Sequence, residues 1–196
     1  KVSMKFTLMS YHYLRYPIRK YLDKMERVGL DGIDIYCTGP QLNPFDYSLG
    51  ALIQLNRDIR DRHLTPYVLT AENCVYPVNQ ALIVSLSRFP CQEIRCGQID
   101  TAQFLECPHI QICPGTGYYD ADKDEAWKRQ VEAVQLLAEY AKKKGVTIFM
   151  ETCKITTTNL VVTSKELKQF IVDVLPGLRH LVGVGKTQQI VRAHII

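Results

Sequence analysis

The chain has 196 residues and a formal net charge of +4; hydrophobic residues make up 46% of it and charged residues 22%. This length is enough for one domain with its own core. The modest charge, without a run of five like-charged residues, argues against a nucleic-acid-binding stripe. No apolar stretch is long enough to span a bilayer, so no membrane partner is expected.

Strand and helix patterns alternate along the whole chain. Strands are predicted at residues 5–10, 32–36, 66–70, 110–113, 146–151 and 180–184. The helices between them are predicted to begin near Pro17, Leu49, Asp122 and Thr163, where turn-forming or capping residues precede apolar residues at helical spacing. Residues 80–98, which contain Pro90, and residues 185–196 do not follow this pattern.

Two architectures are compatible with repeated strand–helix units. The repetition predicts right-handed crossovers and a parallel α/β sheet. A doubly wound open sheet fits the length, whereas a closed (β/α)8 barrel takes roughly 250 residues. Since about six units can be counted, periodicity alone favours the open sheet.

Glu151 is the strongest candidate for a functional residue. It closes the apolar run that begins at Val146 and therefore lies at the carboxyl end of a predicted buried strand. Apolar surroundings destabilise a carboxylate, so such a group usually meets a metal, a cation or a substrate. Ligands also bind at this end of the strands in α/β folds. The alternative is an exposed carboxylate just past the strand.

Three further residues are predicted at the same edge of the sheet as Glu151, the mouth formed by the carboxyl ends of the strands. His12 and Glu72 follow the first and third predicted strands, and Tyr36 ends the second. Carboxylates can bridge sugar hydroxyls and a ring can stack on the sugar face, so the set suits a polyol. Taken singly, His12 could be an ordinary half-buried residue and Tyr36 a core residue.

Other motifs give weaker signals. Gly183–Thr187 lacks the first glycine of a phosphate-binding loop and the third of a dinucleotide fingerprint. Gly115–Gly117 is either a simple turn or a place where backbone approaches a ligand. The seven cysteines form no CxxC pair, which indicates a reduced, cytoplasmic protein. Four of them, Cys37, Cys74, Cys113 and Cys153, fall near predicted strand ends, but only five histidines occur, which argues against a zinc cluster.

Two segments resemble the xylose-isomerase-like TIM barrels of the sugar phosphate isomerase/epimerase superfamily. Residues 29–36 resemble the family segment GYDGIEIW, and residues 70–79 resemble the TPExNxYPxN stretch of fructoselysine 3-epimerase and related ketose 3-epimerases. Glu151, followed eight residues later by Asn159, matches the glutamate of strand five and its following asparagine. The resemblance covers most of residues 4–79 and 100–183.

The resemblance implies a (β/α)8 TIM barrel that is incomplete, with 1–196 as a single partial domain. It further implies a divalent metal, with manganese expected and magnesium, cobalt or zinc as alternatives. Glu151 would be both the first metal ligand and a catalytic acid/base group. The family reaction moves a proton beside a ketose carbonyl through a cis-enediolate, which the metal stabilises. His12, Tyr36, Glu72 and Asn159 would contact the sugar or sugar adduct.

The sequence also departs from the family pattern. Gly185 or Lys186 stands where the strand-six aspartate is expected, and glutamines stand where a family histidine follows. The family histidine of strand seven and glutamate of strand eight have no counterpart, so Glu151 is one of four expected ligands.

From these features we predict a metal-dependent isomerase of the sugar epimerase type. One alternative is a non-catalytic or truncated remnant of the barrel. The other is an endonuclease-IV-like zinc phosphodiesterase, against which the few histidines count. Because an incomplete barrel exposes sheet edges, we also expect a homo-oligomer.

Overall fold

The computed structural model of the chain describes residues 6–37, 41–43, 47–71, 81, 97–176 and 193–194. The elements in chain order are β1 (Thr7–Met9), η1 (Ser10–Tyr13), α1 (Ile18–Val28), β2 (Gly32–Cys37), α2 (Leu49–Asp61), β3 (Pro66–Ala71), β4 (His109–Ile112), α4 (Lys123–Lys143), β5 (Thr147–Glu151), α5 (Ser164–Val174) and β6 (Ala193–His194). Residues 97–104 form a further helix that the sequence analysis did not predict. The strand predicted at 180–184 lies outside the described residues, and β6 falls where no strand was predicted.

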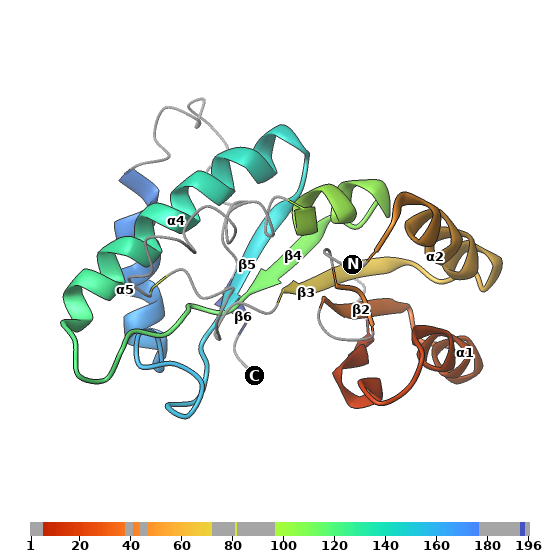
Figure 1. Ribbon diagram of the computed structural model, residues 1–196, viewed down its shortest axis with the longest axis horizontal. Helices are drawn as coiled ribbons and strands as arrows, with labels where there is room; N and C mark the ends of the chain where they lie inside the picture. Colours follow the sequence, from red (N-terminus) through yellow and green to blue (C-terminus); the bar gives the residue numbers. More distant parts are fainter. Residues whose placement is uncertain are drawn as a thin grey trace, which may run out of the picture.

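The described strands form one parallel sheet in sequential order. Each strand pairs with its predecessor in the chain, from β1 through β6. A doubly wound sheet instead reverses direction at a switch point next to its first strand. The preference for an open doubly wound sheet was therefore wrong, and the barrel implied by the family resemblance is confirmed as a partial (β/α)8 arrangement (Figure 1).

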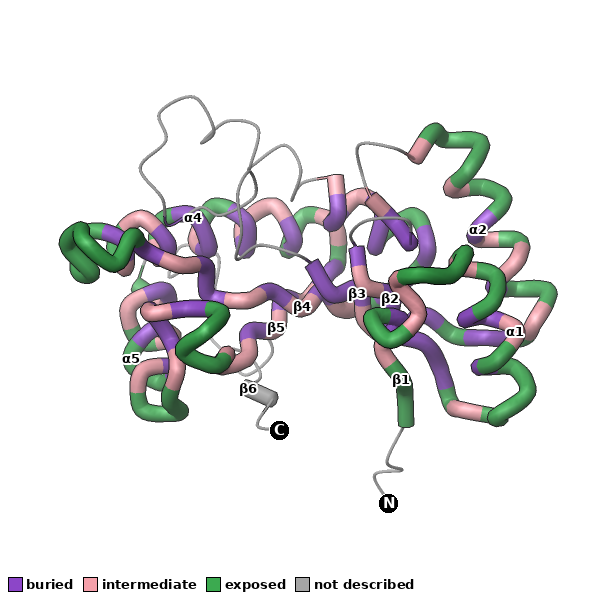
Figure 2. Tube along the Cα trace, turned by 60° about the horizontal axis from the view of Figure 1, so that its bottom comes forward, coloured by how far each residue is buried: buried purple, intermediate pink, exposed green. Residues whose placement is uncertain are grey.

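The two faces of the sheet differ in polarity. Side chains alternate along a strand, so Ile110 and Ile112 of β4 share a face with Ile148 and Met150 of β5, and all four are at most 5% exposed. This face packs on α4 and α5, whose buried residues include Leu137 and Phe170 (Figure 2). The opposite face carries the polar side chains of the strands and is called the polar face.

Local sequence signals explain where the helices begin and end. Pro17 precedes α1, and Gly29, with φ of 68°, ends it in the left-handed conformation that glycine adopts without strain. Thr163 and Glu166 form a capping box at the start of α5, where a helix was predicted to begin. A Cβ atom at Gly32 would collide with the Tyr67 ring and the Thr65 carbonyl oxygen, which explains the glycine at the start of β2.

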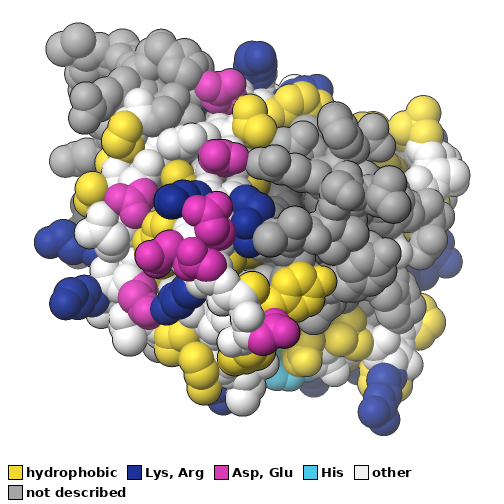
Figure 3. Space-filling view, turned by 60° about the vertical axis from the view of Figure 1, so that its left-hand side comes forward, with side chains coloured by type: hydrophobic (Ala, Val, Ile, Leu, Met, Phe, Trp, Pro, Cys, Tyr) yellow, Lys and Arg dark blue, Asp and Glu magenta, His cyan; other side chains and the backbone are white. Residues whose placement is uncertain are grey.

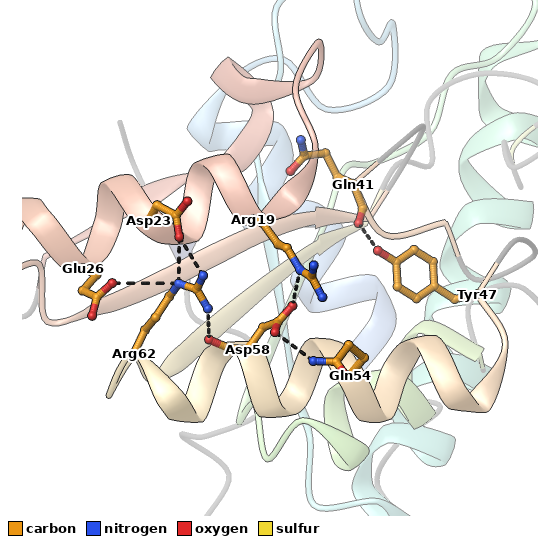
Figure 4. A network of polar contacts seen from close by, with 8 residues as sticks. All are labelled: Arg19, Asp23, Glu26, Gln41, Tyr47, Gln54, Asp58 and Arg62. Atoms are coloured by element: carbon orange, nitrogen blue, oxygen red, sulfur yellow. Dashed lines mark hydrogen bonds and ion pairs between the residues drawn. The ribbon is translucent and has the colours of Figure 1, made fainter.

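A polar network joins α1 to α2 on the outside of the sheet (Figure 4). Arg62 donates to Asp23 at 2.7 and 3.0 Å and to the carbonyl oxygen of Asp58 at 2.7 Å. Arg19 donates to the Asp58 carboxylate at 2.7 Å. Partial desolvation raises the pKa of Asp58. Hydrogen bonds from Arg19 and Gln54 and the positive charges of both arginines outweigh it and hold the pKa below its usual value. The network links α1 to α2.

The surface near α4 and α5 mixes charges of both signs. Figure 3 shows acidic side chains lying beside lysine and arginine side chains on this face. The ion pairs there include Lys123 with Glu166 at 3.2 Å and Lys128 with Glu125 at 2.8 Å. Within the described ranges, no helix combines the length and the apolar composition that crossing a membrane requires.

Candidate functional site

Glu151 lies at the carboxyl end of β5, on the polar face of the sheet. It is half-buried, and it follows Met150, whose Cα is the register partner of Ile112 on β4. Burial raises the pKa of Glu151 above its ordinary value, and the negative charge of Cys153 raises it further. The nearby Gln111 amide opposes these effects, although Gln111 Nε2 has no hydrogen-bond partner of acceptable geometry among the described residues. The carboxylate is thus desolvated and still reachable from solvent.

Two cysteines lie next to this carboxylate. Cys113 follows β4, and Cys153 follows Glu151 by two residues. Ligand atoms of Cys113, Glu151 and Cys153 all lie within 4.8 Å of one another, and each residue is half-buried. Both cysteines were predicted near strand ends, but the few histidines argued against a zinc cluster. The register of β4 against β5 cannot be known from the sequence. The proximity of these cysteines to Glu151 was therefore not predicted.

Asp34 is a second carboxyl group on the same face. It belongs to β2, is 7% exposed, and accepts a hydrogen bond from Thr70 Oγ1 at 2.8 Å. Desolvation raises the pKa of Asp34 to about 7, with the Thr70 hydrogen bond opposing and the charge of Glu151 adding to the rise. Asp34 and Glu151 therefore interact electrostatically across the inside of the sheet. The raised pKa of Asp34 makes this carboxyl a candidate proton donor and acceptor near neutral pH.

Aromatic rings line the mouth at the ends of β1 and β2. Tyr36 is half-buried, and its ring meets Tyr11 edge to face at a centroid distance of 5.2 Å. Tyr11 contacts His12 in the same way at 6.1 Å. The backbone N–H of Tyr36 donates to Ser10 Oγ at 2.9 Å, which ties η1 to the end of β2. His12 is exposed and meets this cluster through its contact with Tyr11.

Asn159 binds the loop that follows β4. Its Oδ1 accepts from the Gly117 N–H at 2.9 Å, and its Nδ2 donates to the Gly117 carbonyl oxygen at 3.1 Å. Thr116 Oγ1 donates to the Thr157 carbonyl oxygen at 2.9 Å, and Thr158 Oγ1 donates to the Gly115 carbonyl oxygen. Gly115–Gly117 is thus clamped to the loop after β5. Asn159 has an evident structural role here, and its sugar contact remains a prediction.

The predicted site residues are therefore only partly brought together. Glu151 stands on the polar face, and Tyr36 with His12 forms the aromatic part of the mouth. Glu72 lies outside the described residues. Asp34 was not identified as a site residue, although an aspartate between Ile33 and Ile35 in a buried strand was a usable signal.

The donor atoms around Glu151 test which metal the site would suit. Thiolates favour zinc and other soft ions, whereas manganese and magnesium prefer oxygen ligands. Among the described residues, the candidate donor set is one carboxylate and two thiols. This set fits a thiophilic divalent ion and does not fit the expected manganese.

Comparison with protein families matches residues 22–184 to the family described as "Xylose isomerase-like TIM barrel". Similar solved structures include a D-psicose 3-epimerase in the presence of D-fructose, with 17% identity, a TM-score of 0.76, and coverage of 97% of this chain and 62% of that one. The D-psicose 3-epimerase of Clostridium cellulolyticum H10 with D-tagatose has 20% identity and a TM-score of 0.73, with coverages of 87% and 60%. An L-ribulose 3-epimerase has 20% identity and a TM-score of 0.72, with coverages of 88% and 57%.

These similarities establish the fold. The chain spans about three fifths of the length of these three solved structures. Comparison with curated protein sequences found no match.

Proposed function

We propose that this chain, which belongs to the xylose isomerase-like TIM barrel family, carries out ketose 3-epimerase-type proton transfer with Glu151 as the reacting carboxylate. The substrate would be a ketose sugar or sugar adduct. The partners implied are small polyols, with a divalent metal as cofactor.

This proposal rests on the position, the partial burial and the raised pKa of Glu151. Its carboxyl group is half-buried at the carboxyl end of β5, the end at which ligands bind in this fold. Burial raises its pKa, so the carboxylate is a stronger base than an exposed glutamate. Abstraction of the weakly acidic proton beside a ketose carbonyl benefits from such a base.

The chain's own residues supply the remaining steps. Glu151 takes the proton from C3, and negative charge then develops on the carbonyl oxygen. A divalent cation bound at Glu151 would supply Lewis-acid stabilisation of that oxygen. Asp34, with a pKa of about 7, is partly protonated at neutral pH and adds a second proton reservoir on the same face of the sheet. Return of a proton from Asp34 to the opposite face of C3 would complete epimerisation, leaving Glu151 protonated and Asp34 ionised.

Recognition of the sugar is assigned to the aromatic mouth. Tyr36 and Tyr11 lie in edge-to-face contact near the ends of β1 and β2. An aromatic face packs against the C–H groups of a sugar, while hydroxyls and the His12 ring can hydrogen-bond to its oxygens. Glu72 and Asn159 are proposed as further sugar contacts on the family resemblance alone.

Solvent exchange tests the proposal. The full chain, stripped with EDTA and reloaded separately with Mn²⁺ and Zn²⁺, is incubated in D₂O with D-fructose, D-tagatose or L-ribulose, and deuterium at C3 is measured by NMR. We expect deuterium to enter C3 of at least one ketose. The Glu151→Gln variant should lose at least 100-fold in rate, as expected when an acid/base group is removed (about 10²–10⁴-fold).

The matched control is Glu125→Gln, the same substitution at an exposed position on α4. It should retain the wild-type exchange rate. Absence of exchange with every ketose and both metals, or equal rates in wild type and Glu151→Gln, would reject the proposed activity.

Binding without turnover is the second candidate. The donor set around Glu151 favours it, because two thiols stand beside the carboxylate, whereas the family resemblance implies oxygen and nitrogen donors. A sugar titration followed by calorimetry, combined with absence of C3 exchange, would select this alternative.

A further inference from the structure

A cluster of two thiols and a carboxylate lies at the ends of adjacent strands. The register pairs Ile112 with Met150, so the next residues, Cys113 and Glu151, lie side by side at the carboxyl ends of β4 and β5. Cys153 follows Glu151 by two residues and returns toward the same side. Backbone register therefore places Cys113 beside Glu151, and the segment just after β5 brings Cys153 to them.

The geometry is close to that of a bound metal. The three ligand atoms lie within 4.8 Å of one another. Around a tetrahedral zinc with Zn–S bonds of about 2.3 Å, two sulfur ligands are about 3.8 Å apart. The ligand atoms would have to move closer together by about 1 Å or less to reach this spacing. Small rotations about the χ angles of the cysteine and glutamate side chains are enough for that movement.

The cluster differs from the other cysteines that the structure describes. Cys37 is fully buried, and burial raises its thiol pKa well above the ordinary value. Cys107 is also buried, and its pKa is raised to about 12. Metal ligation needs the thiolate and an entry path. Cys113, Glu151 and Cys153 are each only half-buried, so an ion can reach them.

We propose that the thiolates of Cys113 and Cys153 and the carboxylate of Glu151 bind a thiophilic divalent cation, with Zn²⁺ preferred over Mn²⁺. Two sulfurs and one oxygen are three protein ligands, the number found in catalytic zinc sites, which keep the fourth position open for water or substrate. Each thiol releases its proton as the metal–sulfur bond forms. This inference shares Glu151 with the proposed function but does not require turnover of any sugar.

Cobalt and zinc titrations test the inference through binding alone. The full chain, reduced and stripped of metal, is titrated with Co²⁺, whose thiolate complexes show a near-ultraviolet charge-transfer band. We expect this band to appear with one equivalent and to be abolished by one equivalent of Zn²⁺ but not of Mn²⁺. In the Cys113→Ser/Cys153→Ser variant, the band should vanish and Zn²⁺ affinity should fall at least about 100-fold, more than an outer-shell substitution costs.

The matched control removes the cysteines outside the described residues. The variant Cys74→Ser/Cys91→Ser/Cys96→Ser should keep the band and the affinity. Persistence of the band without Cys113 and Cys153, its loss in the control, or its absence in the wild type would overturn the inference. Since no sugar is present, failure here is distinguishable from failure of C3 exchange.

A second measurement needs no variant and guards against misfolding. Zn²⁺ should protect Cys113 and Cys153 from alkylation by iodoacetamide, measured peptide by peptide by mass spectrometry. Equal alkylation of these two residues with and without Zn²⁺ would also overturn the inference.

Discussion

Replacing Asp34 with asparagine should remove a large part of the pH dependence of stability. Asp34 is 7% exposed, and its Oδ1 accepts a hydrogen bond from Thr70 Oγ1 at 2.8 Å. Asparagine has nearly the same shape and keeps an oxygen that can accept this bond. The substitution therefore removes the ionisable proton while leaving the packing and the hydrogen bond in place.

The sign of the effect follows from the raised pKa. Burial raises the pKa of Asp34 from 3.8 to about 7. Between these values the folded protein holds a proton that the unfolded chain has lost, so stability falls as pH rises. The effect is complete above pH 7, where the ionised group destabilises the fold by on the order of 4 kcal/mol. Between pH 5 and pH 8 the expected loss is about 2–3 kcal/mol.

Urea denaturation at pH 5 and pH 8, with EDTA present to exclude metal, measures how far the free energy of unfolding falls between these pH values. We expect Asp34→Asn to lose about 2–3 kcal/mol less stability than the wild type over this interval. The matched control is Asp120→Asn, an exposed aspartate before α4, which should follow the wild-type curve. Parallel curves for wild type and Asp34→Asn would refute the reasoning, because they would mean that Asp34 folds with its charge intact.

Three substitutions test the surrounding framework. Thr163→Ala removes the capping box with Glu166 and should lower the free energy of unfolding by about 1 kcal/mol. A loss below about 0.3 kcal/mol in urea denaturation would contradict a stabilising role of the cap. Asn159→Ala leaves the Gly117 N–H and carbonyl without their side-chain partners and should cost about 1–3 kcal/mol; an unchanged melting temperature would argue that the clamp is unimportant. Arg62→Ala should cost about 1 kcal/mol, and 1 M NaCl should reduce this cost only in part, because one bond goes to a backbone carbonyl; a cost that disappears in salt would assign the whole effect to the ion pair.

Much of the fold could be predicted because local signals and family resemblance agree. The α1 helix runs from the residue after Pro17 to the residue before Gly29, as the sequence indicated. Glu151 ends β5, as expected from its apolar run. Periodicity failed for the closure of the sheet, since strand order depends on long-range pairing that a count of units does not contain. It also missed the helix at residues 97–104 and β6.

The candidate site was harder to predict because it depends on register. The sequence placed Cys113 and Cys153 near strand ends, but only the alignment of β4 with β5 brings them beside Glu151. Asn159 was expected to contact sugar, and the structure gives its amide to the backbone of Gly117. The parallel order of the strands thus gathers the side chains at their carboxyl ends into one mouth. The conformation of the loops decides which groups each of these side chains contacts.

The distance from Glu151 to the reacting carbon tests the central claim most directly. A crystal structure of the full chain with Zn²⁺ and D-fructose would measure it. We predict that a Glu151 carboxylate oxygen lies within about 3.5 Å of C3, the separation typical of a near-attack geometry. A ketose bound away from the carboxyl end of β5, or a Glu151 side chain turned from the sugar, would contradict the account.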